Sequence, residues 1–410
     1  MNLLKLSIAN LKEKKLNSFL SALLLTLGIG MISLLLLLNK QLDEQFRRNI
    51  KGIDMVVGAK GSPLQIILSS IYQIDAPTGN IPLSEVATLK RNPFVKTVIP
   101  LSMGDNFNGF RIVGTEKSYI EHFDAKIASG KIFENSMDVT IGSKVASSGT
   151  LKIGSTFASA HGLDAGGDVH GDKKFKVVGI LEPTGSVADQ LILTGLSSVW
   201  DIHEHEEEHH EEALEGAHET DDHEHHKSEE KQVTSALIRF RNPMGLIALP
   251  RQINENTSMQ AALPSIEINR LFSLLGIGIE TLRTLALAII LIAGVSVFVS
   301  LYNSLKERKY EMALMLSMGA TRTKLFLMLL MEGIMLAIIG YVAGILLSRL
   351  GLLAFSKAAE DDFHYSLKQF SLLPEEIYLF IAALVIGLLA AALPSLGIYK
   401  LNISRTLAED

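Results

Sequence analysis

The chain of 410 residues contains no cysteine. This absence excludes thiol catalysis, disulfide bonds and zinc sites with cysteine ligands. The nucleotide-binding pattern G-x-x-x-x-G-K-[S/T] is also missing, because Gly130 and Lys131 are followed by Ile132. Any ATP that drives this protein must therefore bind to another polypeptide. The long apolar runs lack the rows of polar residues that would line a hydrophilic path, which argues against a pore.

The chain has instead four apolar runs of about 20 residues each, the length that a helix needs to cross a bilayer. With 48% hydrophobic residues and a mean hydropathy of +0.28, it is too apolar for a purely soluble protein and too polar for a many-span carrier. The spacing predicts one membrane span, a large soluble block, and then three closely spaced spans. The runs are Phe19–Leu38, Leu285–Leu305, Leu325–Leu347 and Ile377–Ile398.

Lysine and arginine residues predict the orientation of these spans. They gather in the N-terminal tail, in the loop 306–324 and in the C-terminal tail, whereas the loop 349–376 holds only three. Because the positively charged side of a membrane protein is cytoplasmic, we expect both termini inside the cell and the soluble block outside. The first run is too long for a cleaved signal, and no small-x-small cleavage site follows it, so we interpret it as a retained anchor.

These features predict an α-helical membrane protein with four transmembrane helices and an α+β domain between the first and the second. The predicted division is a cytoplasmic tail (1–15), a first span (16–38), an extracytoplasmic domain (39–280) with a His/acid-rich insertion (201–230), a second span (281–305), a cytoplasmic loop (306–324), a third span (325–348), an extracytoplasmic loop (349–376), a fourth span (377–398) and a cytoplasmic tail (399–410).

The soluble block alternates between short β-branched runs and helical patterns, which is typical of an α+β domain, here with room for two lobes. The predicted strands are Asp54–Val57, Thr97–Pro100, Phe110–Val113, Asp138–Ile141, Lys174–Ile180, Gln190–Leu193 and Ser235–Arg239, and the predicted helices are Ser62–Tyr72, Leu83–Arg91 and Leu246–Asn254. Residues 40–51 are predicted to extend the first membrane helix, and Pro264–Arg283 to lead as helix into the second span. Two such helices would form stiff stalks, which transmit displacement better than flexible linkers do.

The loop between the second and third spans has helical periodicity over Lys306–Met318. Met312, Met315 and Leu316 fall on one face, Gly319 is placed to end the helix, and Thr321 to cap the next one. Periodicity alone leaves two alternatives open: an amphipathic helix on the inner membrane surface, or a solvated connector.

A resemblance decides between them. The run from Glu307 to Arg322, ERKYEMALMLSMGATR, resembles the pattern ERxxEIGxLRAxGAxR of the FtsX/MacB-type permeases of ABC transporters, with Leu316 where arginine is usual. Other parts of the chain resemble the same family, namely Glu332-Gly333 and Gly340 in the third span, Pro394-Ser395 and Leu401–Leu407 at the fourth, and Thr184-Gly185, Asp189 and Leu193 to Trp200 in the soluble block.

The resemblance implies a non-enzymatic permease subunit in a bacterial inner membrane, with a periplasmic domain and a separate cytoplasmic ATPase that holds the ATP. It implies a second permease copy or a paralogue, and a periplasmic or outer-membrane partner is compatible with it. The surrounding lipid is a further contact, whereas nothing predicts nucleic-acid binding. The residues expected to contact the ATPase are Glu307, Arg308, Glu311, Leu314, Gly319, Ala320 and Arg322. The expected mechanism is mechanical transmission from this coupling loop to the outside domain.

The acidic balance of the chain is local. Residues 201–230 contain fourteen acidic residues and one lysine, so the rest of the chain carries a net charge of +7. Eight of the twelve histidines lie in the same segment. Imidazoles and carboxylates together suit Zn²⁺ and other divalent metals. The expected metal ligands are His203, His205, His209, His210, His218, His223, His225 and His226.

The His-rich segment favours a zinc-linked transport process, and other functions stay open. Lipoprotein release and drug or peptide export are alternatives within the family. A metal-sensing membrane receptor without an ATPase is the alternative from another class. The spacing His205-Glu206-x-x-His209 also matches the zinc-protease pattern, but it arises easily in a tract this rich in His and Glu and lacks an apolar helix face, so we reject that interpretation.

Overall fold

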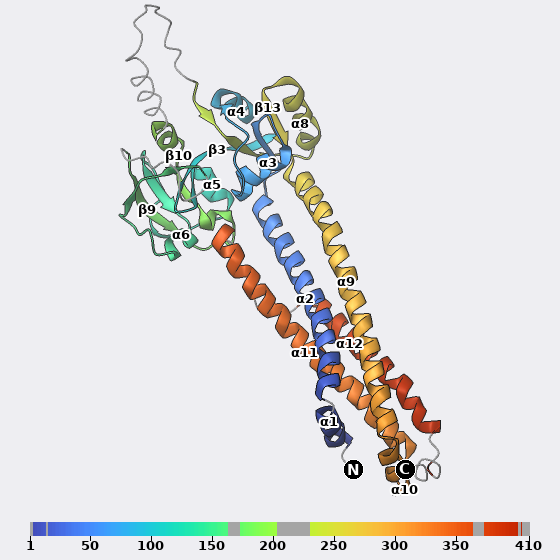
Figure 1. Ribbon diagram of the computed structural model, residues 1–410. Helices are drawn as coiled ribbons and strands as arrows, with labels where there is room; N and C mark the ends of the chain where they lie inside the picture. The colour runs from blue at the N-terminus through green and yellow to red at the C-terminus, as the bar shows by residue number, and fades with distance from the viewer. Residues whose placement is uncertain are drawn as a thin grey trace, which may run out of the picture. The chain divides into compact units, whose positions relative to one another are not determined.

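The computed structural model describes residues 3–13, 15–162, 173–202, 230–363, 373–400 and 403. The chain forms two compact units, one made of Met1–Asp43 with Leu274–Asp410 and the other of Glu44–Ser273. The first is a helical bundle and the second contains a β-sheet (Figure 1). This arrangement confirms the predicted α+β domain between the first long helix and the later ones.

Four helices in the described part of the chain are long and apolar enough to cross a membrane. They are α2 (Lys15–Ile50), α9 (Pro264–Glu307), α11 (Arg322–Phe363) and α12 (Glu375–Ser395). As the sequence predicts, α2 continues past the first apolar run without a break, and α9 begins well before the second.

Apolar side chains from all four long helices meet in the core of the bundle. Leu25 and Ile29 of α2, Ala293 of α9, Leu336 of α11 and Ala391 of α12 are all buried there. Two glycines of α11, Gly340 and Gly344, lie close to α2. A Cβ added at Gly340 would lie 2.7 Å from the Cβ of Leu25, and one at Gly344 would lie 3.0 Å from the Cβ of Ile29. These two glycines therefore let α11 pack closely against α2.

The predicted extracytoplasmic loop 349–376 is partly helical in the structure. Helix α11 continues to Phe363, and α12 begins at Glu375, directly after Pro374. The helix thus runs beyond residue 348, where the apolar run was predicted to end. The next residues, from Leu350 to Ser356, hold no proline, and they extend the helix instead.

The second unit, Glu44–Ser273, is called the soluble unit below, and its described residues contain a sheet of eleven strands. Nine strands follow the order β13-β1-β12-β3-β4-β10-β6-β9-β5. Of the other two, β7 pairs with β9 and β8 pairs with β3. The strands of this sheet are β1 (Met55–Ala59), β3 (Val95–Phe107), β4 (Phe110–Thr115), β5 (Ile127–Gly130), β6 (Asp138–Ile141), β7 (Thr156–Phe157), β8 (Ala160–His161), β9 (Phe175–Leu181), β10 (Ile192–Gly195), β12 (Ser235–Phe240) and β13 (Met259–Ala262). A separate pair joins β2 (Ile81–Pro82) to β11 (Gln232–Val233). All seven predicted strands are present.

One strand joins the two halves of the sheet. Residues 95–101 of β3 pair antiparallel with β12, whereas residues from Ser102 onward pair with β4. The β12 side packs on a cluster that includes Val98 and Ile238, and the far side packs on another that includes Val139 and Phe175. A third cluster takes residues from both halves of the sheet, among them Ile99, Val113 and Leu237, so the two halves share part of their core.

The helices of the soluble unit follow the predicted patterns. They include α3 (Pro63–Ile67) with the π-helical turn η1 (Leu68–Tyr72), α4 (Leu83–Lys90), α5 (Lys117–His122), α6 (Ser143–Ser147), the 3₁₀ turn η2 (Val187–Gln190) and α8 (Met244–Asn256). Ser62 caps α3 by accepting a hydrogen bond from the amide of Gln65, and Pro63 occupies the first turn, where a missing N–H is harmless.

The end of α2 and the start of α9 belong to the core of the soluble unit. The ring of Phe46 packs 4.6 Å from that of Tyr72 and 5.4 Å from that of Phe272, measured between centroids. The hydroxyl of Tyr72 donates to the carbonyl oxygen of Phe46 over 2.9 Å, and Asn49 accepts from the amide of Val187 over 3.0 Å. Both long helices are therefore held firmly in this unit by aromatic packing and buried hydrogen bonds.

Candidate functional site

The predicted coupling element is a short helix, α10 (Lys309–Ser317), between α9 and α11. It is shorter than predicted, because Lys306 and Glu307 still belong to α9 and the backbone bends at Arg308 (φ −103°, ψ 17°). Gly319 ends it with a left-handed conformation (φ +94°). The amide of Gly319 bonds to the carbonyl of Leu316, and that of Ala320 to the carbonyl of Met315. This is the glycine-dependent helix end that the sequence indicated.

The inner face of α10 packs on the base of the bundle. Met312 is buried with Leu305 of α9, Leu325 and Met328 of α11, and Ile398 of the 3₁₀ turn η3 (Leu396–Lys400). Met315 and Leu316 pack against the same cluster. The face predicted from the periodicity is therefore the buried one, and α10 packs against the bundle and is not a solvated connector. The predicted amphipathic character is not found, because apolar residues lie on the outer face as well.

The outer face of α10 carries an exposed apolar strip. The exposed fractions of Tyr310, Leu314 and Met318 are 44%, 43% and 73%. Their spacing of four residues places them in one row along the outer face of α10. Such a row on a helix suits insertion into a groove of a partner protein. Of the predicted contact residues, Leu314 lies in this strip, and Glu307, Glu311, Gly319 and Arg322 are exposed beside it; Tyr310 and Met318 were missed because they read as ordinary members of an apolar loop.

Three of the predicted contact residues also hold the loop together. The guanidinium Nε of Arg308 lies 2.8 Å from a carboxylate oxygen of Glu311, and the Arg308 side chain is only 11% exposed. Glu311 lies in the first turn of α10, where a negative charge is favoured by the helix dipole. Arg322 donates from Nη1 to the carbonyl oxygen of Tyr399 over 2.9 Å. Arg308 therefore acts mainly inside the loop, and Ala320 is only half-buried.

The N-terminal helix α1 (Leu3–Glu13) packs on α11 close to the coupling element. The amide nitrogen of Asn10 donates to a carboxylate oxygen of Glu332 over 2.5 Å, and the hydroxyl of Ser7 donates to the carbonyl oxygen of Met328 over 3.2 Å. Both Asn10 and Glu332 are buried. The carboxylate of Glu332 therefore has a hydrogen-bond partner within the bundle, and this partner comes from the helix that precedes the first apolar run.

A second polar cluster joins three long helices, and the sequence reasoning missed it. Arg349 of α11 places Nη2 at 2.9 Å from both carboxylate oxygens of Glu376 of α12, and the two residues are 8% and 3% exposed. The hydroxyl of Ser33 of α2 donates to Glu376 over 2.7 Å and lies 3.0 Å from that of Ser348. This ion pair was not predicted because residues 349–376 were assigned to a loop. A lone arginine and a lone glutamate at the ends of two apolar runs are a signal from which such a pair could be predicted.

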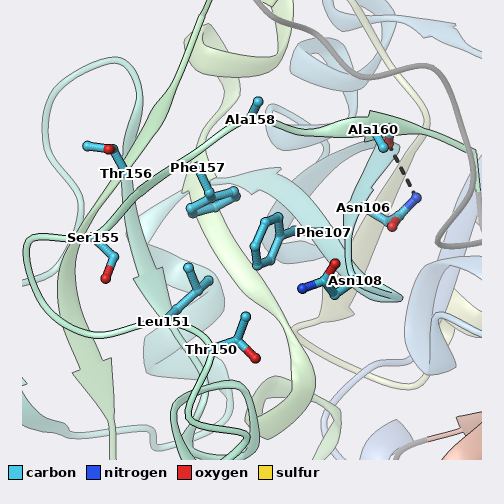
Figure 2. Close-up of a pocket in the computed structure, with 10 residues that line it drawn as sticks. All are labelled: Asn106, Phe107, Asn108, Thr150, Leu151, Ser155, Thr156, Phe157, Ala158 and Ala160. Atoms are coloured by element: carbon cyan, nitrogen blue, oxygen red, sulfur yellow. Dashed lines mark hydrogen bonds between the residues drawn. The ribbon is translucent and has the colours of Figure 1, made fainter.

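The soluble unit contains an open cavity of about 550 Å³ beside the turn between β3 and β4. Figure 2 shows the rings of Phe107 and Phe157 facing one another in it, 4.6 Å apart between centroids. Asn106 donates to the carbonyl oxygens of Ala160 and Gly162, so its amide has a structural role. None of the ten lining residues is ionisable. The described part of the lining therefore offers no acid, base or charged metal ligand for catalysis.

No group of three or more His, Asp or Glu residues gathers as a metal site in the ranges that the structure describes. The eight histidines predicted as metal ligands, from His203 to His226, lie outside the described residues. Metal binding by that segment therefore stays a prediction from its composition.

Comparison with known families matches both parts of the chain. A model of the MacB-like periplasmic core domain matches residues 18–224, slightly more than half of the chain, and a model of the FtsX-like permease C-terminal domain matches residues 283–403. The chain belongs to the FtsX/MacB-type permeases of ABC transporters. It is similar to the periplasmic region of MacB from Actinobacillus actinomycetemcomitans, with 12% identity and a TM-score of 0.33 over 54% of this chain and 95% of that one. A comparison with curated protein sequences found no significant match.

Membership in the FtsX/MacB-type permeases gives α10 its context. The second matched region contains α10 with the helices on either side of it. Permeases of this family are generally non-catalytic subunits that work with a cytoplasmic ABC ATPase, which agrees with the missing nucleotide-binding pattern. The exposed strip on α10 is therefore a candidate contact surface for such a partner.

Replacing Leu314 and Met318 together by glutamate should prevent the ATPase from binding. Charges would enter a surface that a groove must desolvate, and an apolar anchor of this kind is worth about 2 kcal/mol or more, so binding should weaken more than tenfold. Co-purification and titration of the ATPase against the permease in detergent measure this effect. The matched control is I153E/M244E, which makes the same change at two exposed apolar residues of the soluble unit. Equal ATPase affinity in both variants would contradict the assignment of the strip.

Glu376→Gln should lower the free energy of unfolding by about 3–5 kcal/mol, because it leaves the buried guanidinium of Arg349 without a counter-charge. Denaturant unfolding in mixed micelles measures the change. The control is R349M/E376L, which removes both charges and should be far closer to the unmodified protein. If E376Q is as stable as the unmodified chain, the ion pair does not stabilise the bundle.

Proposed function

We propose that this chain is the permease subunit of an ABC transporter complex of the mechanotransmission type. A cytoplasmic ATPase binds the exposed strip of α10, and ATP binding and hydrolysis displace α10. The displacement passes along α2 and α9 to the soluble domain outside the membrane, where the work is done. In this proposal the complex lies in the bacterial inner membrane with both termini in the cytoplasm, and contains a second copy or a paralogue of this chain.

The continuity of α2 and α9 is the observation that carries the proposal. Helix α9 runs from Pro264 to Glu307, so a single hydrogen-bonded rod ends two residues before α10 begins. At its other end, Ile268, Leu271 and Phe272 pack into a core of the soluble unit. Helix α2 ends in the same core through Phe46 and Ile50. A rod that is fixed in a core at one end and joined to a partner-binding helix at the other can transmit force.

The bundle supports transmission better than passage of a substrate. Its core is filled by leucine, isoleucine, valine and alanine from all four long helices. Both polar clusters described above have their charged or amide groups engaged with one another: Asn10 with Glu332, and Arg349 with Glu376. Groups that are engaged in this way lock helices together and do not line a hydrated path.

We further propose that the transport process is linked to zinc or another divalent metal. The support comes from composition alone: eight histidines and many carboxylates within residues 203–226 of the outside domain. Histidine and carboxylate ligands suit Zn²⁺, and the surrounding negative charge attracts cations. In this proposal the segment binds the metal as a ligand or as cargo. The ATP-driven displacement of α10 needs no metal in this chain.

A helix break in the exposed part of α9 tests the mechanical step. Gly278 has no atom within 4 Å of an added Cβ, so its replacement disturbs the helix and little else. Gly278→Pro removes an intrahelical hydrogen bond and clashes with the preceding turn, at a cost of about 3 kcal/mol. We expect the ATPase to bind normally to this variant but to lose its nucleotide-dependent effect on the soluble domain.

The absence of native cysteine allows this effect to be measured with two spin labels, at introduced cysteines replacing Lys152 and Ser317. The ATP-dependent change in their separation should disappear in G278P and persist in the control Gly278→Ala. An unchanged response in G278P would contradict transmission through α9.

Deleting residues 203–226 should lower the number of Zn²⁺ ions bound per chain, measured by equilibrium dialysis of the purified protein. Replacing only the eight histidines with glutamine is the matched control, because it keeps every carboxylate. If the imidazoles are the ligands, that variant should lose about as much zinc as the deletion does. An unchanged stoichiometry in the deletion would show that the segment is not a metal site.

A further inference from the structure

A charged pocket of about 390 Å³ lies in the soluble unit, where α2 ends. Its volume is within the range of about 300–1,000 Å³ that is usual for small-molecule sites. The ionisable residues that line it are Arg48, Lys51, His122, Asp124, Lys126 and Glu182. The described residues that line it do not include the coupling helix or the cavity beside β3 and β4.

The charges of this pocket are available to a ligand. Three cations, Arg48, Lys51 and Lys126, share the pocket with the carboxylates of Asp124 and Glu182. All five side chains are exposed. Among the described residues, none of the five forms an ion pair at 4 Å or less. The pocket thus presents an excess of one positive charge together with two acceptors for a cationic group.

One wall of the pocket is rigid. The carboxylate of Asp189 accepts hydrogen bonds from the amides of Thr184 and Gly185, over 2.8 and 2.7 Å, and from the hydroxyl of Thr184. Arg48 donates from Nη1 to the carbonyl oxygen of Gly185 over 3.2 Å. Gly185 has a φ of +70°, and a Cβ there would lie 2.4 Å from Nη1 of Arg48. The positive φ favours glycine at this position, and the guanidinium of Arg48 contacts the backbone of this wall.

His122 contributes shape more than charge. Its burial, and next the positive charge of Arg239, lower the pKa of the imidazole below its usual value. The ring is therefore neutral near pH 7. Its Nε2 is buried and has no hydrogen-bond partner among the described residues. The positive charge that a ligand meets comes from the arginine and the two lysines.

We propose that this pocket binds a phosphoryl group that carries a nearby ammonium group, the zwitterionic chemistry of phosphoethanolamine. Arg48, Lys51 and Lys126 bind the phosphoryl oxygens, as lysines and arginines do in other anion sites. Asp124 and Glu182 bind the ammonium group. A phosphate without an amine would leave these carboxylates unpaired beside it, which disfavours binding.

Two sources could supply this group, a phospholipid headgroup or a water-soluble phosphodiester. Arg48 follows Leu38, the last residue of the first apolar run, by ten residues in the same helix, so a lipid headgroup is a natural candidate. The inference needs no ATPase and no zinc, and its failure would leave the proposed function untouched.

Calorimetric titration of the purified full chain in detergent tests the chemistry. The probes are glycerophosphoethanolamine, glycerol phosphate and inorganic phosphate. Glycerophosphoethanolamine should bind most tightly, and K51A/K126A should weaken it at least tenfold, because two charge-assisted contacts are lost (about 1.4 kcal/mol per tenfold). D124N/E182Q should bind glycerophosphoethanolamine and glycerol phosphate with similar affinity. The matched control K152A/K176A removes two exposed lysines outside the pocket and should bind like the unmodified chain.

Nanodiscs distinguish the two sources. If the lipid is the source, the chain in phosphatidylethanolamine discs should no longer take up soluble glycerophosphoethanolamine, whereas the chain in phosphatidylglycerol discs should. Equal uptake in both discs identifies the soluble source, and both results support the site. The proposal is overturned if K51A/K126A binds like its control, or if inorganic phosphate binds as tightly as glycerophosphoethanolamine.

Discussion

The structure depends on a constraint that acts on the backbone. Inside an apolar layer every N–H and C=O group needs a partner from the protein, and an uninterrupted helix supplies one for each residue. Helices α2, α9, α11 and α12 meet this requirement along their apolar runs. Helix α2 keeps the same hydrogen-bonding pattern after its apolar run has ended, and α9 has this pattern before its apolar run begins. Both helices therefore enter the soluble unit as rods. The stiffness that the proposed mechanism requires therefore follows from the need to pair every backbone N–H and C=O group inside the bilayer.

Polar side chains in the bundle obey a related rule. Glu332 and Glu376 are buried in apolar helices, and each has a specific partner: the amide of Asn10, or the guanidinium of Arg349 with the hydroxyl of Ser33. Apolar packing between such helices is tolerant of sliding and rotation, whereas a charge-assisted hydrogen bond fixes two atoms relative to each other. The glycines at 340 and 344 add close backbone contact between α2 and α11. Together these contacts define how α1, α2, α11 and α12 fit side by side.

Much of this architecture could be predicted from the sequence because its signals are local. Apolar length predicts the long helices, β-branched alternation predicts strands such as Asp138–Ile141, and Gly319 predicts the end of α10. The buried face of α10 followed from its periodicity. Short strands such as β7 and β8 were missed because two residues carry no period. The sheet order was missed because pairing between distant segments leaves no trace in a single sequence.

The candidate sites also differ in whether their residues are close together in the sequence or come from distant segments. Leu314 and Glu311 were predicted as contact residues from the resemblance to a family motif, whereas the exposure of Tyr310 and Met318 beside Leu314 became visible only on the folded helix. The pair Arg349–Glu376 and the pocket around Arg48 join residues separated by 27 positions or more. Their function arises from contact between elements, and neither partner is unusual where it stands in the chain.

The thirteen-residue strand β3 has a consequence for how the soluble unit comes apart. Its first half pairs with β12, in one lobe of the sheet, and its second half pairs with β4, in the other, with no loop between them. A loop would let one lobe fray while the other persisted, but a shared strand makes each lobe supply an edge for its neighbour. The two lobes therefore form one cooperative folding unit, and amide exchange along β3 should report a single opening event and not two.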